Sequence, residues 1–135
     1  MNRLEEGSKE VVLRMRRKNK YNAKTTIVDG IKFHSQAEAI YYNQLKWLKQ
    51  NKQIKDFKLQ PKYILQEGFP KNGKNYRPIT YTADFEVYKL NGAVEVIDIK
   101  GTITKEFAIK RKLFEYKYLY SITLLKYQNG QFVEV

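Results

Sequence analysis

The stretch that decides the fold is Pro78–Lys100, PITYTADFEVYKLNGAVEVIDIK. Its first half alternates apolar and polar side chains, which predicts one strand over residues 78–88 with a buried face and a polar face. The apolar members are Tyr81, Ala83, Phe85 and Val87. Its second half, Val94–Lys100, is rich in β-branched residues, and Asn91-Gly92 between the halves favours a tight hairpin turn. The stretch therefore predicts two antiparallel strands of one sheet.

Two amphipathic helices are predicted before and after this stretch. The first begins after Ser35, a good N-cap residue, and runs to about Lys52. Its expected inward stripe is Ala37, Tyr41, Leu45 and Leu48. The second runs from about Thr104 to Tyr120. Its expected inward stripe is Ile109, Leu113, Tyr116 and Tyr120.

Turn residues and β-rich runs account for the remaining chain. A hairpin is expected around Asp29-Gly30, and Lys71-Asn72-Gly73-Lys74-Asn75 is expected to be a basic turn. Further strands are expected at residues 54–59, 63–69, 122–127 and 131–135. The order predicts an α/β fold with a mixed central β-sheet and a helix on either side. We expect residues 25–135 to form one domain and residues 1–24 to form a basic N-terminal arm.

The composition indicates a polyanionic partner. Lys and Arg total 26 and Asp and Glu total 14, which gives a net charge of +12 in 135 residues. The absence of Cys excludes disulfides and thiolate zinc sites, and the single His excludes sites that need two imidazoles. No apolar run approaches the roughly 18 residues of a membrane span. We therefore expect a soluble protein of the cytoplasm.

With so little His and Cys, any metal must be held by oxygen ligands, which favours Mg²⁺ or Mn²⁺. Asp98 and Lys100 are two residues apart on a strand, so both side chains emerge on one face. A carboxylate and an amine at the end of a β-branched strand break the local pattern, and such breaks are expected at functional sites. Three acid-x-lysine tripeptides occur in the sequence, but Asp98-Ile99-Lys100 alone has an acid, Asp84, on the adjacent strand.

Asp84 followed by Asp98-Ile99-Lys100, with Glu38 on the upstream helix, resembles the PD-(D/E)XK nuclease superfamily. The stretch DGIKFHSQAE at residues 29–38, followed by two tyrosines, is similar to the start of small phage-encoded members described as endonucleases or Holliday-junction resolvases. The likeness covers roughly residues 20–120 and departs at Ala83, where the superfamily has Pro. It implies a restriction-endonuclease-like core of the order αβββαβ.

The resemblance implies Mg²⁺-dependent hydrolysis of DNA phosphodiester bonds, with Mn²⁺ as a substitute for Mg²⁺. Asp84, Asp98 and the backbone carbonyl of Ile99 would ligate the metal, and Glu38 would complete the set directly or through water. A metal lowers the pKa of bound water toward neutrality. Lys100 would orient that water or neutralise charge on the phosphoryl oxygens. The family setting implies a homodimeric phage or prophage enzyme of recombination or replication that acts on branched DNA.

Two basic segments are candidate DNA contacts. Those of the N-terminal arm are Arg14, Arg16, Arg17, Lys18 and Lys20. Those of the second helix are Lys110, Arg111, Lys112, Tyr116 and Lys117. Lys112 and Tyr116 resemble the superfamily's Gln-x-x-x-Tyr pattern, with Lys in place of Gln. Each segment also has a plainer interpretation, as a mobile basic tail or as a solvated helix face.

Each acidic candidate has a structural interpretation as well. Glu38 stands three residues after Ser35, so the two can form a capping box. Asp84 can be an ordinary outward-facing polar residue, and Asp98 with Lys100 can be a surface ion pair.

Alternatives also remain at the level of function. The chain can be a non-catalytic basic nucleic-acid-binding protein, because charge alone would suffice for that role. It can also be a nuclease of the same fold with a restriction, nicking or exonuclease role. Trp47 is expected in the core rather than as a platform for base stacking.

Overall fold

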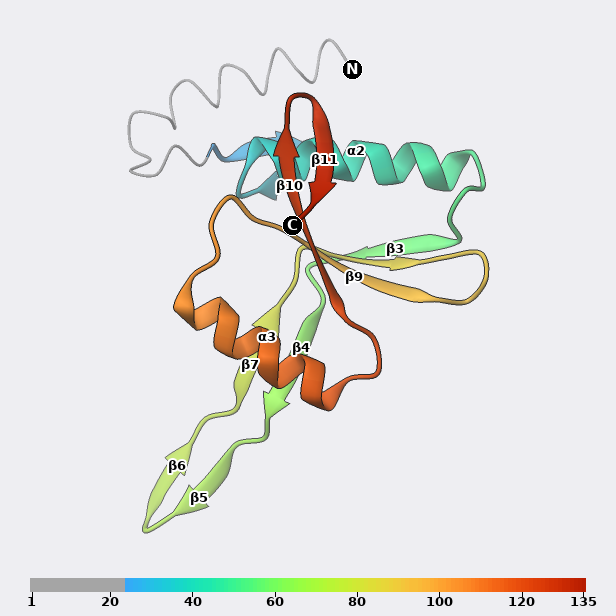
Figure 1. The fold of residues 1–135 in the computed structure, drawn as a ribbon. Helices are drawn as coiled ribbons and strands as arrows, with labels where there is room; N and C mark the ends of the chain where they lie inside the picture. The colour runs from blue at the N-terminus through green and yellow to red at the C-terminus, as the bar shows by residue number, and fades with distance from the viewer. Residues whose placement is uncertain (1–23) are drawn as a thin grey trace. The chain divides into compact units, whose positions relative to one another are not determined.

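The computed structural model describes residues 24–135 (Figure 1). These residues divide into two compact units at the boundary between Leu48 and Lys49. We describe each unit separately. The predicted basic arm at residues 1–24 lies, apart from its last residue, outside the described residues. Within the described part of the chain, no helix is long and apolar enough to cross a membrane.

The first unit contains a hairpin and all but the last two residues of a long helix. Strands β1 (Thr26–Val28) and β2 (Ile31–Phe33) pair in antiparallel fashion, as predicted. The two turn residues between them have positive φ angles, 53° at Asp29 and 76° at Gly30, as a two-residue type I′ turn requires. Helix α2 (Gln36–Gln50) follows Ser35, also as predicted.

The buried face of α2 differs from the predicted stripe. Tyr41 and Leu45 are buried as expected, but Ala37 and Leu48 are only half-buried. The other buried residues of α2 are Glu38, Ala39 and Tyr42. The prediction that Trp47 lies in the core is wrong, since 59% of this residue is exposed. Trp47 follows Leu45 by two positions, which in a helix turns its side chain to a different face.

The second unit is built on a five-stranded sheet with the strand order β11-β10-β9-β8-β3. Its strands are β3 (Asp56–Leu59), β8 (Phe85–Tyr88), β9 (Val94–Ile99), β10 (Ile122–Gln128) and β11 (Gln131–Glu134). β9 and β10 are parallel, and the other neighbours are antiparallel. Helix α3 (Lys105–Lys117) makes the crossover between the two parallel strands. The predicted α/β fold with a mixed sheet is therefore confirmed.

The predicted single strand over residues 78–88 is divided in two. β7 (Ile79–Thr82) pairs with β4 (Lys62–Gln66), whereas β8 pairs with β3 and β9. The change of partner occurs at Ala83-Asp84, where the Ala83 N–H donates to the Pro61 carbonyl at 3.0 Å and the Gln60 N–H donates to the Asp84 carbonyl at 2.9 Å. The predicted alternation survives this break. Its apolar members, Tyr81, Ala83, Phe85 and Val87, are all buried.

The predicted strand over residues 63–69 is likewise divided. β4 ends at Gln66, and β5 (Phe69–Lys71) then pairs with β6 (Lys74–Tyr76). The chain thus leaves the central sheet after β3, runs out through β4 and β5, and returns through β6 and β7 to β8. The basic turn predicted at residues 71–75 forms the far end of this excursion.

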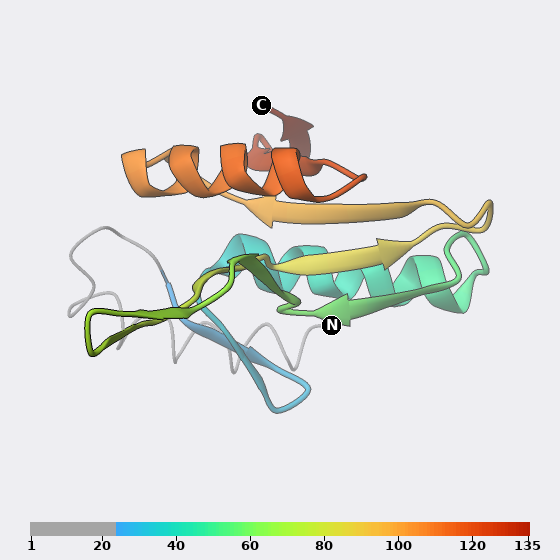
Figure 2. The ribbon, with the colours of Figure 1, turned by 90° about the horizontal axis from the view of Figure 1, so that it is seen from below.

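Helix α3 packs on one face of the sheet through Phe107 and Phe114 (Figure 2). These two rings share a buried cluster with residues of the central sheet and of the β4–β7 hairpin. The other buried members are Tyr63, Leu65, Tyr81, Ala83, Val96, Ile122 and Leu124. The predicted inward stripe of this helix is wrong at Ile109 and Tyr116, which are 63% and 93% exposed.

Candidate active site

The β8–β9 hairpin brings Asp84 beside Asp98. The register pairs Phe85 with Ile97, so Asp84 stands opposite Asp98 just before β8 begins. The Asp84 N–H donates to the Ile97 carbonyl at 3.1 Å, and Asp84 Oδ2 accepts the Ile99 N–H at 2.7 Å. The Asp84 carboxylate is thereby held against the backbone of β9, next to the residue that carries the second carboxylate.

Asp98 is buried, with 3% of the residue exposed. Its Oδ2 atom accepts a hydrogen bond from the Tyr81 hydroxyl, and Lys100 Nζ lies 3.5 Å from the same oxygen. Asp98 and Lys100 thus form the ion pair that the structural interpretation expected, but its location at the surface is wrong for Asp98, which is buried. A carboxylate removed from water needs such partners, because burial of an unpaired charge is costly.

Tyr81 is a neutral hydrogen-bond donor to this site. Burial raises the pKa of its hydroxyl, and the negative charges of Asp98 and Asp84 raise it further. The influence of both aspartates on one hydroxyl places the three side chains in a single electrostatic group. Tyr81 therefore holds the Asp98 carboxylate in place throughout the neutral range of pH.

Lys100 lies between Asp98 and the start of α3. Its ammonium group stands 4.5 Å from the centroid of the Phe107 ring, an arrangement typical of a cation–π contact. The Phe107 N–H in turn donates to the side chain of Thr104, the N-cap of α3, at 3.1 Å. The Lys100 side chain keeps 28% of its surface exposed. The amine is thus oriented on two sides and still accessible to a ligand.

Tyr81 is the site residue that sequence reasoning missed. On one continuous strand Tyr81 and Asp84 would point to opposite faces, because their separation is odd. The chain instead changes partner at Ala83-Asp84, and Tyr81 comes to the same side as Asp98. The hydroxyl reaches the site because the chain changes its pairing strand between β7 and β8, and the local sequence does not predict that change.

The donor set fits a hard divalent cation in its chemistry. Asp84, Asp98 and the Ile99 carbonyl supply oxygen atoms alone, which are the ligands that Mg²⁺ and Mn²⁺ prefer. Among residues 24–135, no three His, Cys, Asp or Glu side chains gather closely enough to hold a metal by themselves. The described carboxylate pair is therefore a partial shell, which water, a phosphate oxygen or a further side chain would complete.

Glu38 belongs to the other unit, where it takes part in the N-terminal cap of α2. The Glu38 N–H donates to Ser35 Oγ at 3.1 Å, and the Ser35 hydroxyl donates to Glu38 Oε2 at 3.2 Å. The capping interpretation of this residue is thus confirmed in a modified form, since the carboxylate accepts from the Ser35 hydroxyl. Glu38 is nevertheless buried, which is unusual for a residue that only caps a helix.

A second polar cluster of the first unit links the hairpin to α2. Asp29 Oδ2 accepts hydrogen bonds from the Tyr42 hydroxyl, at 2.9 Å, and from the Lys46 ammonium. The Lys46 and Tyr42 hydrogen bonds lower the pKa of Asp29, whereas burial and Asp29 raise the pKa of Tyr42 to about 12. These residues fix the turn against the helix.

The basic candidates on α3 have different surroundings. Lys117 Nζ donates to the Ile64 carbonyl at 2.7 Å and so ties the end of α3 to β4. Lys110 lies 3.9 Å from Glu106, one helical turn earlier. Lys112 and Tyr116 are exposed, and Arg111 is half-exposed. The candidates of the N-terminal arm, Arg14, Arg16, Arg17, Lys18 and Lys20, lie outside the described residues.

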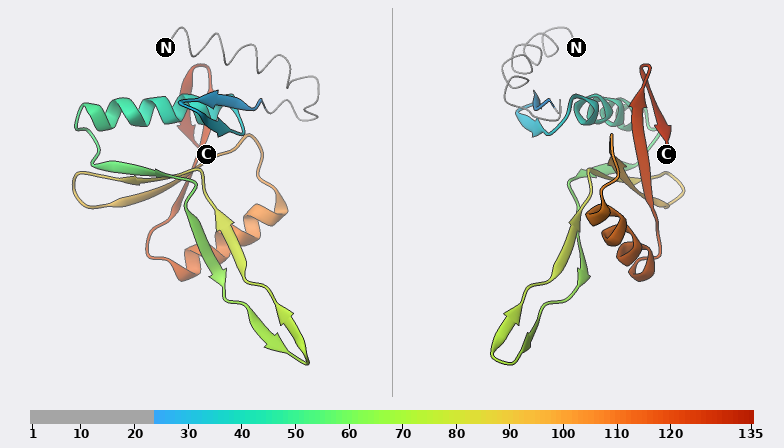
Figure 3. Two further views of the ribbon diagram at one scale, coloured as in Figure 1. Left: turned by 180° about the vertical axis from the view of Figure 1, so that it is seen from behind. Right: turned by 60° about the vertical axis from the view of Figure 1, so that its left-hand side comes forward.

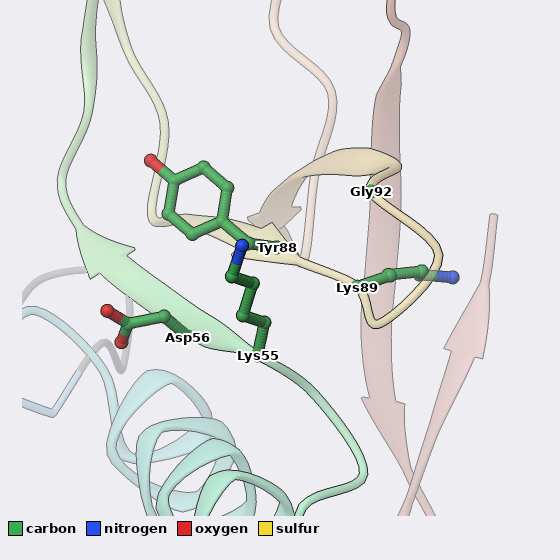
Figure 4. Close-up of a pocket in the computed structure, with 5 residues that line it drawn as sticks. All are labelled: Lys55, Asp56, Tyr88, Lys89 and Gly92. Carbon is green, nitrogen blue, oxygen red and sulfur yellow. The ribbon is translucent and has the colours of Figure 1, made fainter.

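A hollow of about 500 Å³ lies at the other end of the β8–β9 hairpin (Figure 4). Its lining residues are Lys55, Asp56, Tyr88, Lys89 and Gly92. Asp56 already pairs with Lys49 at 2.9 Å, and Lys89 lies 3.7 Å from Glu95. Because Asp84 and Asp98 lie at the opposite ends of these strands, the hollow is separate from the acid–lysine site.

The fold and the site define an α/β protein with a mixed sheet and a buried aspartate beside a second aspartate and a lysine. The chain belongs to the family described as "Protein of unknown function (DUF1064)", which matches residues 18–129. This range includes Glu38, Asp84, Asp98 and Lys100. No match was found among curated proteins.

Proposed function

We propose that the protein is a Mg²⁺-dependent DNA endonuclease of the PD-(D/E)XK type that hydrolyses phosphodiester bonds. The observation that carries the proposal is the group formed by Asp84, Asp98 and Lys100. A buried carboxylate, a second carboxylate fixed by a backbone N–H and a partly accessible amine meet at the end of β9. Such a group has little structural purpose, because an apolar strand end would pack at lower cost.

The order of elements supports the same proposal. If the excursion through β4–β7 is left out, the chain runs α2, β3, β8, β9, α3, β10. This is the order αβββαβ expected of a restriction-endonuclease-like core. The excursion is then an insertion between the first and second core strands.

Each residue of the site has a role in the proposed reaction. Asp84, Asp98 and the Ile99 carbonyl would hold the cation, and Glu38 is the candidate for a further ligand. When bound, the cation supplies positive charge that polarises a phosphate and makes deprotonated water available near neutral pH.

The chain's own groups do the positioning. The Tyr81 hydroxyl and the Ile99 N–H hold the two carboxylates in place. The Lys100 ammonium would orient the attacking water or stabilise negative charge on the phosphoryl oxygens. Mn²⁺ would substitute for Mg²⁺, because both take oxygen ligands.

Electrostatics favours a nuclease over a non-catalytic DNA-binding protein. The net charge of +12 suits either function. Two carboxylates placed side by side would repel DNA phosphates, however, and so would weaken a protein that only binds. A divalent cation would neutralise the two carboxylates, and the adjacent Lys100 would then leave the site positive and attractive to phosphate.

The first test is a cleavage assay on linear duplex DNA with and without Mg²⁺. Asp98→Ala and Asp84→Ala should each lower cleavage by roughly a hundredfold or more while DNA binding stays nearly unchanged. Asp56→Ala is the matched control, because Asp56-Phe57-Lys58 repeats the acid-x-lysine pattern on β3, but Asp56 stands opposite Tyr88 rather than a second acid. The expectation that this tripeptide has no acid on its adjacent strand is wrong, since Glu86 of β8 stands opposite Lys58. Cleavage by either site variant within a few-fold of wild type would refute the assignment.

We further propose that the enzyme is a homodimer that prefers branched DNA, as a phage or prophage recombination nuclease would. Its candidate contacts are mostly lysines and arginines, which bind backbone phosphates and carry little sequence information. Selectivity would then come from the shape of the DNA, and a two-fold dimer matches a four-way junction.

Competition between junction, flap, duplex and single-stranded DNA, together with gel filtration, tests this preference. A monomer that cuts linear duplex as readily as a junction would contradict the junction preference while leaving the metal nuclease intact.

A further inference from the structure

The inference concerns the far end of the β4–β7 excursion, residues Phe69–Tyr76, which we call the finger. Its two strands, β5 and β6, form a sheet of their own, and all their residues are exposed. Figures 1 and 3 show the finger projecting away from the five-stranded sheet and from α3 of the same unit. Burial of apolar surface therefore does not explain why this segment is ordered.

The finger has a defined shape at both of its ends. At the tip, Asn72 and Gly73 have φ angles of 52° and 74°, as a two-residue type I′ turn requires. At the root, a Cβ on Gly68 would lie 2.8 Å from the Tyr76 carbonyl oxygen, so the two strands approach each other closely there. Local sequence thus fixes the shape of the finger, through Asn72-Gly73 at its tip and Gly68 at its root.

One face of the finger carries two matched pairs of side chains. Phe69 stands opposite Tyr76, and Lys71 stands opposite Lys74. Since alternate residues of a strand share a face, both pairs lie on the same side of the ribbon. The two rings stack with their centroids 4.9 Å apart and their planes 16° apart, and each residue is 42% exposed. Lys74 Nζ lies 5.0 Å from the centroid of the Tyr76 ring.

The lysine pair is unfavourable in the isolated protein. Like charges directly opposite each other destabilise a pair of strands, and neither strand of the finger contains an Asp or Glu. A polyanion that bridges the two ammonium groups would remove that repulsion. The stacked rings beside them offer apolar surface to whatever part of the polyanion lies between its phosphates.

We infer that the finger is a DNA-binding ribbon that lies in a groove of duplex DNA, with Lys71 and Lys74 on phosphates and the Phe69–Tyr76 pair against the groove wall. A two-stranded ribbon has the width that the major groove admits. The inference rests on the proposed function only for its choice of DNA as the polyanion. The finger would hold the duplex next to the site that cuts it.

The test measures binding of the full-length protein to a fluorescent DNA duplex in EDTA, where a metal-dependent nuclease does not cut. Lys71→Ala with Lys74→Ala should weaken binding about tenfold at fixed salt. The plot of log K against log salt should become shallower by about 2, because two phosphate contacts are lost. Phe69→Ala with Tyr76→Ala should also weaken binding but leave the salt slope unchanged.

The matched control is Lys55→Ala with Lys89→Ala, two exposed lysines at the hollow of Figure 4. A finger variant that binds duplex DNA as the control does would overturn the inference. A finger variant that weakens binding to single-stranded DNA but not to duplex DNA would also overturn it. So would a variant that changes the gel-filtration volume and leaves DNA binding unchanged, because the finger would then contact protein rather than DNA. The urea midpoint of each variant should stay within error of wild type, because all residues of β5 and β6 are exposed and none belongs to the buried cluster of this unit.

Failure of this inference and failure of the proposed function can be told apart. Loss of binding in the finger variants with no cleavage by wild type in Mg²⁺ would keep the finger and reject the nuclease. Cleavage by the wild-type protein together with unchanged DNA binding in the finger variants would keep the nuclease and reject the DNA-binding role of the finger.

Discussion

At the scale of single residues, the burial of Asp98 requires a physical reason. Removing an ionised carboxylate from water costs on the order of several kcal/mol. Hydrogen bonds and an opposite charge must offset that cost in the folded protein. The Tyr81 hydroxyl and the Lys100 ammonium supply both. The same arrangement keeps the carboxylate in a fixed orientation, which a metal ligand needs and a surface charge does not.

Glu38 offers the sharpest test of a single residue, because its capping role and its proposed metal role respond differently to substitution. Glu38→Gln keeps an oxygen that can accept from the Ser35 hydroxyl. We expect this variant to retain its urea midpoint and to lose most of its Mg²⁺-dependent cleavage.

Ser35→Ala is the control for Glu38. It removes the N-cap oxygen of α2 and should lower the free energy of unfolding by about 0.5–2 kcal/mol while cleavage persists at low temperature. A Glu38→Gln protein with wild-type activity would assign Glu38 to the cap alone.

Part of this site was predictable from the sequence and part was not. Counting residues back from the Asn91-Gly92 turn brings Asp84 close to Asp98 at the open end of the hairpin. A two-residue turn there would pair Asp84 with Ile99. The loop instead has three residues between Lys89 and Ala93, and this makes Asp98 the partner. The role of Tyr81 depends on a strand that changes partner at Ala83-Asp84. A change of partner is a tertiary event and leaves the alternation of apolar residues intact, so the sequence cannot reveal it.

At the scale of elements, α3 shows why a helical pattern can be assigned to the wrong face. Apolar residues occur on several sides of this helix, so a stripe through Ile109 and Tyr116 is as regular as one through Phe107 and Phe114. Packing decides between them. The aromatic pair seven residues apart meets the rings of Tyr63 and Tyr81, which no local pattern can foresee.

We predict opposite consequences for two aromatic residues of α3 that are two positions apart. Phe114→Ala should lower the free energy of unfolding by about 3–5 kcal/mol, because it empties a fully buried ring site. Tyr116→Ala should change it by less than about 0.5 kcal/mol, because the side chain is exposed. Urea unfolding followed by circular dichroism measures both values, and similar losses in the two variants would contradict this packing.

At the scale of the whole molecule, buried tyrosines couple stability to alkaline pH. Tyr63 and Tyr88 both donate to the carboxylate of Glu86, and Tyr81 donates to Asp98. Burial raises the pKa of Tyr63 and of Tyr81, and the Glu86 hydrogen bond raises the pKa of Tyr88 to about 12. The folded chain therefore holds protons that the unfolded chain releases above its ordinary tyrosine pKa of about 10.

The sign of the effect follows from proton linkage. A group with a raised pKa in the folded state contributes its full stability below the unfolded pKa, and that contribution declines as the pH rises above it. We therefore expect the contribution of these tyrosines to the free energy of unfolding to be constant up to about pH 10 and to fall between pH 10 and 12, by about 1.4 kcal/mol per pH unit for each buried tyrosine. Urea unfolding at a series of pH values measures this slope.

The variant Tyr81→Phe should be less stable than wild type at pH 8, because Asp98 loses a hydrogen-bond donor. Above pH 10, however, its free energy of unfolding should fall less steeply with pH than that of wild type, because one raised tyrosine pKa is absent. Equal slopes for the two proteins would show that Tyr81 ionises as readily in the folded chain as in water, and would remove it from the site.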